Sequence, residues 1–147
     1  MAQSWLLTWN PKKTASHVLR NMRIECLNTG DCKTNWNTCS RNLHKGDTFY
    51  LMKIGSKQKN GIIGYGIIDS DTYFENYINE NGEIKKCKSV DVIFKHIFED
   101  TDEGYILLEK LVELFPKQCW LPKFSGLLIS QDISKELANL IQQRINV

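Results

Sequence analysis

Three segments of the chain combine aromatic, glycine and small polar residues in a pattern that suits the binding of a flat molecule. The first is Trp36-Asn37-Thr38-Cys39-Ser40, and two apolar segments follow it, at residues 46–52 and 61–66. We interpret these segments as an aromatic-bearing loop that leads into two adjacent strands. Such a loop can hold a ring at the mouth of a pocket, while glycines let a ligand or a neighbouring backbone come close. The pattern indicates recognition of a flat group.

Residues for other kinds of chemistry do not accompany these segments. The sequence contains no recognisable nucleophile–base pair, phosphate-binding loop or metal-ligand motif. The cysteines are odd in number and form no Cys-x-x-Cys pair, which argues against a disulfide framework and a zinc knuckle and favours reduced thiols in the cytoplasm. They are Cys26, Cys32, Cys39, Cys87 and Cys119. We therefore expect a binding protein without catalytic residues, metal or cofactor.

Length and charge limit the possible partners. A chain of 147 residues fits one domain, residues 1–147, with a single core. No apolar run approaches the roughly 20 residues needed to span a bilayer, and no signal peptide is apparent. Residues 1–60 carry 10 Lys and Arg against 3 Asp and Glu, whereas residues 61–147 carry 9 against 14. The basic first part predicts a surface that faces a polyanion, unless folding mixes the two parts.

Hydrophobic patterning predicts one α+β domain with a mostly antiparallel, barrel-like sheet. We expect strands at 4–9, 47–54, 61–69, 88–98 and 127–129, with 47–54 and 61–69 forming a hairpin. We expect helices at 15–27, at 106–115 and from Ser130 to Ile145, the last with a buried stripe of leucine and isoleucine. The segment 28–41 is predicted to be a polar loop, and residues 73–86 are polar with a turn at Asn81-Gly82.

Six motifs occur in an order that resembles a known family. They are Leu6-Leu7-Thr8-Trp9-Asn10-Pro11, Trp36-x-x-Cys39-Ser40, Gly46-Asp47-x-Phe49-Tyr50-Leu51, Gly61-Ile62-Ile63-Gly64-x-Gly66, Val90-Asp91-Val92 and Trp120-x-Pro122-x-x-Ser125-Gly126. Together they resemble the EVE domain of the PUA-like superfamily, in the form found at the N-terminus of HNH-type, modification-dependent restriction endonucleases. The resemblance extends over nearly the whole chain.

The resemblance implies a fold and a partner. The implied fold is a bent, mostly antiparallel PUA-like β-barrel flanked by helices and related to YTH domains. The implied partner is double-stranded DNA from which one modified base, such as 5-methylcytosine or 5-hydroxymethylcytosine, is flipped into an aromatic pocket. The family's HNH region is absent, since His17, His44 and His96 lack the required neighbours. Cleavage would therefore belong to a linked or separate HNH nuclease.

A pocket for a flipped base needs ring faces and polar groups at the base edge. Trp36 is either a ligand contact or a plug on the core, and Trp9, at a strand end, is the site tryptophan if Trp5 is the core one. Trp120 is a pocket residue or a lid, and Asp69 is an acceptor for an exocyclic amine or a strand-end turn residue. The full candidate pocket comprises Trp9, Asn10, Trp36, Cys39, Ser40, Asp69, Trp120, Ser125 and Gly126.

Basic residues of the first part are the candidate phosphate contacts. They are Lys12, Lys13, Arg20, Arg23, Arg41, Lys57 and Lys59. Two other functions compete with the DNA reader. One is an RNA-binding PUA-like module without a modification preference, and the other, an enzyme acting on a small ligand, lacks an activated nucleophile.

Overall fold

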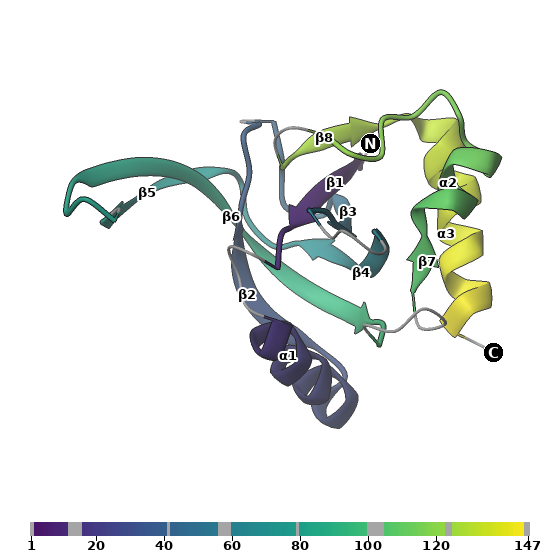
Figure 1. Cartoon of the computed structure of the whole chain (residues 1–147), viewed down its shortest axis with the longest axis horizontal. Coiled ribbons are helices and arrows are strands. Elements are labelled where there is room, and N and C mark those ends of the chain that lie inside the picture. The colour runs from purple at the N-terminus through teal and green to yellow at the C-terminus, as the bar shows by residue number, and fades with distance from the viewer. Residues whose placement is uncertain are drawn as a thin grey trace.

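The computed structural model describes residues 2–11, 16–40, 42–55, 60–78, 80–99, 105–122 and 125–145. It is an α+β structure with one mixed sheet and three helices (Figure 1). The strands are β1 (Ser4–Trp9), β2 (Cys32–Asn37), β3 (Thr48–Lys53), β4 (Gly61–Ile68), β5 (Tyr73–Ile78), β6 (Ile84–Ile97), β7 (Ile106–Leu107) and β8 (Leu127–Ile129). The helices are α1 (Ser16–Thr29), α2 (Leu108–Leu114) and α3 (Gln131–Ile145).

The sheet follows the order β2-β6-β4-β3-β1-β8, and β5 and β7 add to it alongside β6 and β4. β1 and β3 are parallel, whereas the other paired strands are antiparallel. Register shifts interrupt β3–β4 and β4–β6, and such bulges bend a sheet. Among the described residues no ladder joins β2 to β8, so the sheet is bent but not closed. The expected α+β class and mostly antiparallel sheet are confirmed, and the expected closure is not found.

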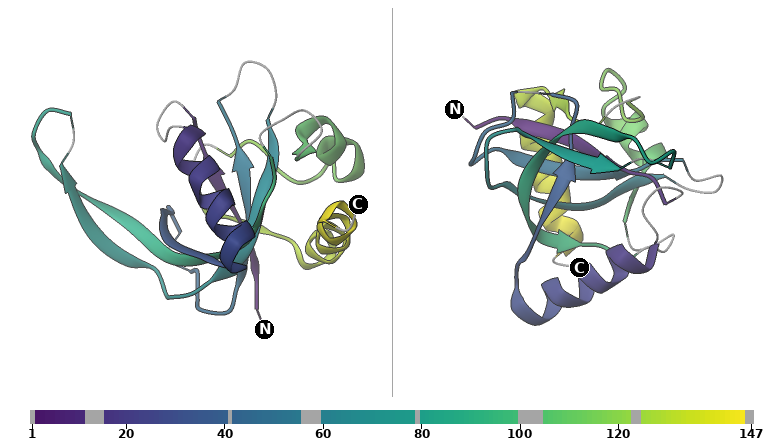
Figure 2. Two further views of the ribbon diagram at one scale, coloured as in Figure 1. Left: turned by 90° about the horizontal axis from the view of Figure 1, so that it is seen from below. Right: turned by 90° about the vertical axis from the view of Figure 1, so that its left-hand side faces the viewer.

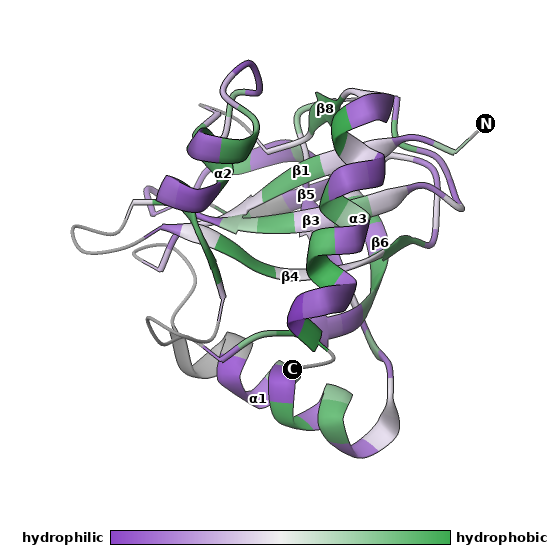
Figure 3. Ribbon diagram, turned by 90° about the vertical axis from the view of Figure 1, so that its right-hand side faces the viewer, coloured by the Kyte–Doolittle hydropathy of each residue, from purple (hydrophilic) through white to green (hydrophobic). Residues whose placement is uncertain are grey.

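The core lies where strands are apolar on both faces. β1, β3 and β4 are almost wholly buried, as the unbroken apolar runs in their sequences require. α3 lies across one face of these strands (Figure 3), where Leu137 and Ile141 are buried and Gln142 Nε2 donates to the Tyr65 hydroxyl at 3.3 Å. Burial also raises the pKa of Tyr50 on this face to about 12. α1 covers the other end of the sheet, against β2 and β6 (Figure 2).

The glycines of β4 serve close backbone packing. A Cβ atom added at Gly61 would overlap the carbonyl oxygen of Ile106, and one at Gly66 would overlap that of Ile93. The sequence left open whether a ligand or a neighbouring backbone comes close to these glycines. In the structure the neighbouring backbones do so at both positions.

A two-stranded arm extends from the body of the molecule (Figure 1). β6 is 14 residues long, and its second part lies between β2 and β4. Its first part pairs with β5, from Tyr73↔Ser89 to Ile78↔Ile84, and the turn of this hairpin contains Gly82 with a φ of 78°. The strand expected at 88–98 therefore begins earlier, and the polar segment 73–86 contains a strand that periodicity did not reveal.

Two other expectations are wrong. The predicted loop at 28–41 contains β2, which pairs along its whole length with β6. The inward side chains of β2 are Cys32, Thr34 and Trp36, and the polar Thr34 between the other two interrupts the hydrophobic period. The helix predicted from Ile106 begins at Leu108, since Ile106 and Leu107 pair with β4.

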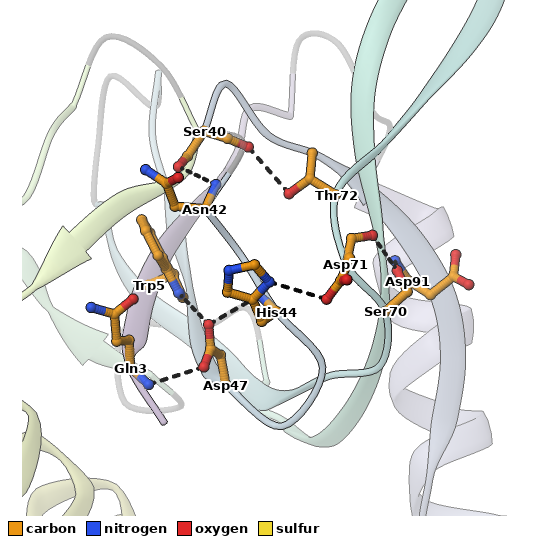
Figure 4. A network of polar contacts seen from close by, with 10 residues as sticks. All are labelled: Gln3, Trp5, Ser40, Asn42, His44, Asp47, Ser70, Asp71, Thr72 and Asp91. Carbon is orange, nitrogen blue, oxygen red and sulfur yellow. Dashed lines mark hydrogen bonds and ion pairs between the residues drawn. The ribbon is translucent and has the colours of Figure 1, made fainter. Parts of the chain in front are cut away.

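A carboxylate fixes the loop before β3 (Figure 4). Asp47 is buried and accepts hydrogen bonds from Gln3 N at 3.0 Å, Trp5 Nε1 at 2.9 Å and His44 N at 3.1 Å. The outer part of the same region is held by an exposed pair, His44 Nδ1 with Asp71 Oδ1 at 3.1 Å. Asp47 thus connects the start of β1 to the loop that leads into β3.

Candidate functional site

A cleft of about 720 Å³ opens between the end of β1, the end of β2 and the root of the β5–β6 arm. Five of the nine candidate pocket residues line it: Trp9, Asn10, Trp36, Cys39 and Ser125. A second depression of about 390 Å³ adjoins it and is lined by Cys39, Ser40, Ser125 and Gly126 together with Cys119, Pro122 and Leu127. The sequence motifs that lie far apart in the chain therefore meet around two neighbouring hollows.

Trp36 lies at the end of β2 and is held from two sides. Its Nε1 donates to the carbonyl oxygen of Thr8 at 2.8 Å, and its ring meets that of Phe94 edge-on with centroids 5.9 Å apart. The side chain is half-buried and lines the cleft. The two alternatives for Trp36 are thus combined, because it packs on the core and still presents ring surface to the cleft. Its loop assignment was wrong, and a strand fixes the ring more firmly than a loop would.

Mainly backbone hydrogen bonds join the two ends of the bent sheet, between which the described residues form no strand ladder. Ser125 Oγ accepts from the Thr8 backbone N–H at 3.1 Å, and the Ser125 carbonyl accepts from Cys39 N at 2.7 Å. Gly126 N donates to the Leu6 carbonyl at 3.0 Å. These bonds hold the residues after β2 beside the start of β8. We call this junction, formed by residues 38–40 and 125–126, the seam.

Gly126 permits the seam to form. Its φ is +101°, and a Cβ atom there would overlap Thr38 Oγ1 and come within 3.3 Å of Ser40 N. We expect Gly126→Ala to lower the unfolding free energy by more than the roughly 1–3 kcal/mol of backbone strain alone, and to increase hydrogen exchange at the Cys39 amide.

Gly82→Ala is the matched control for this variant. Gly82 also has a positive φ, of +78°, but nothing lies within 4 Å of its added Cβ. Chemical denaturation of both variants separates strain from overlap. Equal losses of unfolding free energy in the two variants would contradict the role given to the seam.

Trp9 differs from its expected position. Its side chain is only 1% exposed, as buried as the core residue Trp5, and Lys53 Nζ lies 5.7 Å from its ring centroid. Trp9 therefore forms part of the cleft wall and does not overhang a cavity. The side chain of the next residue, Asn10, lies against Gly55, where an added Cβ would be 2.8 Å from Asn10 Oδ1.

Two candidate pocket residues lie away from both hollows. Trp120 is buried beside the ring of Phe115, and its Nε1 donates to the Phe115 carbonyl at 3.2 Å, so it packs on the body of the domain. Asp69 follows β4, and its backbone N–H donates to the Asp91 carbonyl at 2.8 Å. Of the alternatives stated for each, the structure places Trp120 as a packing residue and Asp69 as a strand-end residue.

The candidate phosphate contacts are placed only in part. Lys12, Lys13, Arg41, Lys57 and Lys59 lie outside the described residues. Arg20 is exposed on α1, and Arg23 on the same helix is half-buried, with an Nε that has no hydrogen-bond partner among the described residues. Burial, and secondarily the charge of Arg23, lower the pKa of His96. Neither arginine lines the cleft.

Sequence reasoning missed four residues that the arm brings to the cleft. Phe74 comes from β5, and Lys86, Cys87 and Lys88 come from β6. Lys88 Nζ also donates to the Cys39 carbonyl at 2.9 Å, across to the seam. The signal that could have revealed them is the turn at Asn81-Gly82, with residues on either side that pair as a hairpin.

The described part of the chain contains neither a cluster of metal-ligating residues nor a membrane-spanning helix. No group of three or more His, Cys, Asp and Glu in this part could hold a metal ion. None of its helices is long and apolar enough to cross a membrane. The cleft is lined by the Trp36 indole, the Thr34 hydroxyl, the Asn10 amide and the ammonium groups of Lys86 and Lys88.

Comparison with known proteins finds no match for this chain. The chain matches no family model, no curated protein and no solved structure. The resemblance to the EVE domain therefore rests on the six sequence motifs alone.

Proposed function

We propose that this protein is a PUA-like, EVE-related reader of modified DNA, which receives one flipped base in the cleft beside Trp36. The observation that carries the proposal is the fixed position of Trp36, whose ring lines the cleft while its Nε1 bonds to Thr8. A modified cytosine, 5-methylcytosine or 5-hydroxymethylcytosine, is the proposed base. The chain itself recognises and does not cleave; an HNH nuclease, linked or separate, supplies cleavage.

Energetics supports a pocket with more than one contact. Extruding a base from duplex DNA costs a few kcal/mol, and stacking on one aromatic ring returns about 1–3 kcal/mol. Trp36 provides one such ring. Trp9 is too buried to provide the second, so the remaining free energy must come from edge hydrogen bonds or from another ring at the cleft.

Polar groups for the base edge lie along the same wall. Thr34, on the same face of β2 as Trp36, lines the cleft together with Asn10, whereas Asn35 and Asn37 alternate to the other face, where they bond to Glu75 and Ser89. Asparagine supplies both a donor and an acceptor, and threonine supplies a hydroxyl. This combination suits the Watson–Crick edge of a base, which presents donors and acceptors together.

A panel of duplexes tests the proposal. The duplexes differ only in one central base: cytosine, 5-methylcytosine, 5-hydroxymethylcytosine, adenine or N6-methyladenine. We expect tighter binding of a duplex with modified cytosine than of its unmodified counterpart, and still tighter binding when the modified base lies opposite a mismatch, because flipping then costs less. Single-stranded RNA of the same sequence is the competing ligand.

Fluorescence distinguishes flipping from groove reading. A 2-aminopurine next to the modified base should brighten on binding, since its stacking partner leaves the helix. Absence of brightening together with weaker binding of the mismatched duplex would contradict a base pocket. Tighter binding of RNA, irrespective of modification, would favour the RNA-binding alternative.

A further inference from the structure

The β5–β6 arm carries apolar side chains that are largely exposed. Phe74 is 57% exposed, Ile78 72% and Ile84 73%. A lone two-stranded hairpin is at best marginally stable in water, and exposed apolar groups on it add no packing to offset this. Contiguous exposed apolar surface on a folded protein marks a place where something binds.

The register gathers these side chains on one face of the arm. Directly paired residues point to the same side, and residues along a strand alternate. Phe74 pairs with Lys88, and Ile78 pairs with Ile84. The resulting inner face, which continues onto the cleft, consists of Phe74, Asn76, Ile78, Ile84, Lys86 and Lys88.

Charge separates this inner face from the outer one. The strand residues of the inner face include two lysines and no carboxylate. The outer face carries Glu75, which accepts from Asn35 Nδ2 at 3.2 Å, and Asp91, which accepts from the Tyr73 hydroxyl at 2.7 Å. Glu83, next to the turn, pairs with Lys85 at 3.4 Å. A surface that combines exposed aromatic and aliphatic groups with unopposed cations suits nucleic acid, whose bases stack and whose phosphates are anionic.

The inner face is continuous with the cleft. Phe74, Lys86 and Lys88 line the cleft together with Trp36, and β6 lies between β5 and β2 in this region. A strand of DNA leaving the cleft on this side would pass over Phe74 and the two lysines before reaching the isoleucines near the turn.

We propose that the inner face of the arm binds the DNA strand that flanks the flipped base, an inference that rests on the proposed function. Lys86 and Lys88 contact phosphates, Phe74 stacks on the nucleotide next to the flipped one, and Ile78 and Ile84 lie against the sugars beyond it. A second copy of this chain is the less suitable occupant. Two inner faces meeting about a two-fold axis would bring lysines together without a carboxylate on either face.

A double variant and a matched control, also with two substitutions, test the phosphate contacts. We expect Lys86→Ala/Lys88→Ala to weaken binding of modified and unmodified duplexes by similar factors. The slope of log affinity against log salt should become less steep by about 1.8, that is, about 0.9 for each lost phosphate contact. Lys33→Ala/Lys85→Ala is the control, because it removes the same charge from the outer faces of β2 and β6 and should leave the slope unchanged.

Phe74 provides an independent readout. Phe74→Ala should weaken binding about 5- to 150-fold, the range of one base–aromatic stack, and Phe74→Tyr should restore it. Because Phe74, Lys86 and Lys33 are exposed, their substitution should leave thermal unfolding unchanged. Lys88→Ala also removes the bond to the Cys39 carbonyl, so binding of that double variant is measured at a temperature at which circular dichroism shows it folded.

The outcomes separate this inference from the proposed function. If the wild-type protein prefers modified DNA but the two double variants show equal salt slopes, the arm does not bind DNA and the inference is wrong. If no modified duplex is preferred but Lys86→Ala/Lys88→Ala alone flattens the slope, the reader function fails and the DNA-binding arm stands. A wild-type dimer that Ile78→Ser/Ile84→Ser converts to a monomer, measured by sedimentation, would show that a second copy covers the arm and would overturn the inference.

Discussion

Asp47→Ala is expected to lower the free energy of unfolding by about 3 kcal/mol or more. The substitution removes the acceptor of three N–H groups, those of Gln3, His44 and the Trp5 side chain. Each donor left without a partner in a buried or half-buried place costs about 1–3 kcal/mol. Trp5 is fully enclosed in the core, so water cannot replace the carboxylate there. Chemical denaturation followed by far-ultraviolet circular dichroism measures the loss.

Two variants distinguish this role from a general effect of charge. Asp47→Asn keeps the shape and one acceptor oxygen, so its loss should fall between those of the wild-type protein and Asp47→Ala. Asp71→Ala removes an equal charge from the exposed pair with His44 and should cost less than about 1 kcal/mol. Similar losses for Asp47→Ala and Asp71→Ala would show that the carboxylate of Asp47 does not organise the loop.

The strands at the centre of the sheet could be predicted because their signal is local. β1, β3 and β4 contain dense runs of branched and aromatic residues, bounded by turns, and burial on both faces demands such runs. α3 was likewise predictable from its apolar stripe, of which Leu137 and Ile141 are buried.

β2 and β5 could not be predicted because pairing with β6, and not their own residue types, makes them strands. β2 consists of Cys-Lys-Thr-Asn-Trp-Asn, in which every residue except Trp36 and Cys32 also suits a loop. Pairing with β6 supplies the hydrogen bonds that make it a strand, and this pairing joins residues about 60 positions apart in the chain. The same holds for β5, whose only paired neighbour among the described residues is β6.

The candidate site was predictable in part, because several of the sequence motifs that suggested it lie close together in the fold. The segments around Trp9, Trp36 and Ser125 do meet, and the seam shows how, through bonds from Ser125 to Thr8 and Cys39. Which tryptophan faces the cleft was not predictable, because Trp5 and Trp9 share the strand pattern of a buried residue. The contribution of the arm was missed because the side of a hairpin on which a lysine lies depends on the pairing register of the two strands. The sequence alone does not give that register.

Trp36→Ala is expected to abolish the preference for modified DNA. Loss of one base–aromatic stack corresponds to about 1–3 kcal/mol, or roughly 5- to 150-fold in affinity for the modified duplex. Binding of the unmodified duplex should hardly change, since it depends on phosphate contacts. The structure adds a second effect, because the ring also packs on Phe94 and bonds to Thr8. We therefore expect some loss of stability as well, and binding must be measured at a temperature at which circular dichroism shows the variant folded.

Two further substitutions separate the loss of stability from the loss of recognition. Trp36→Phe keeps a ring but leaves the Thr8 carbonyl without its indole donor, so it should destabilise the protein while retaining part of the preference. Trp5→Phe removes an indole N–H of comparable value from the core, where it donates to Asp47 away from the cleft. It should destabilise the protein and leave the preference intact.

If Trp5→Phe and Trp36→Ala reduced the preference equally, the effect would follow from stability, and Trp36 would be a packing residue alone. A preference that depends on Trp36 and survives Trp5→Phe would place the modified base at the cleft ring.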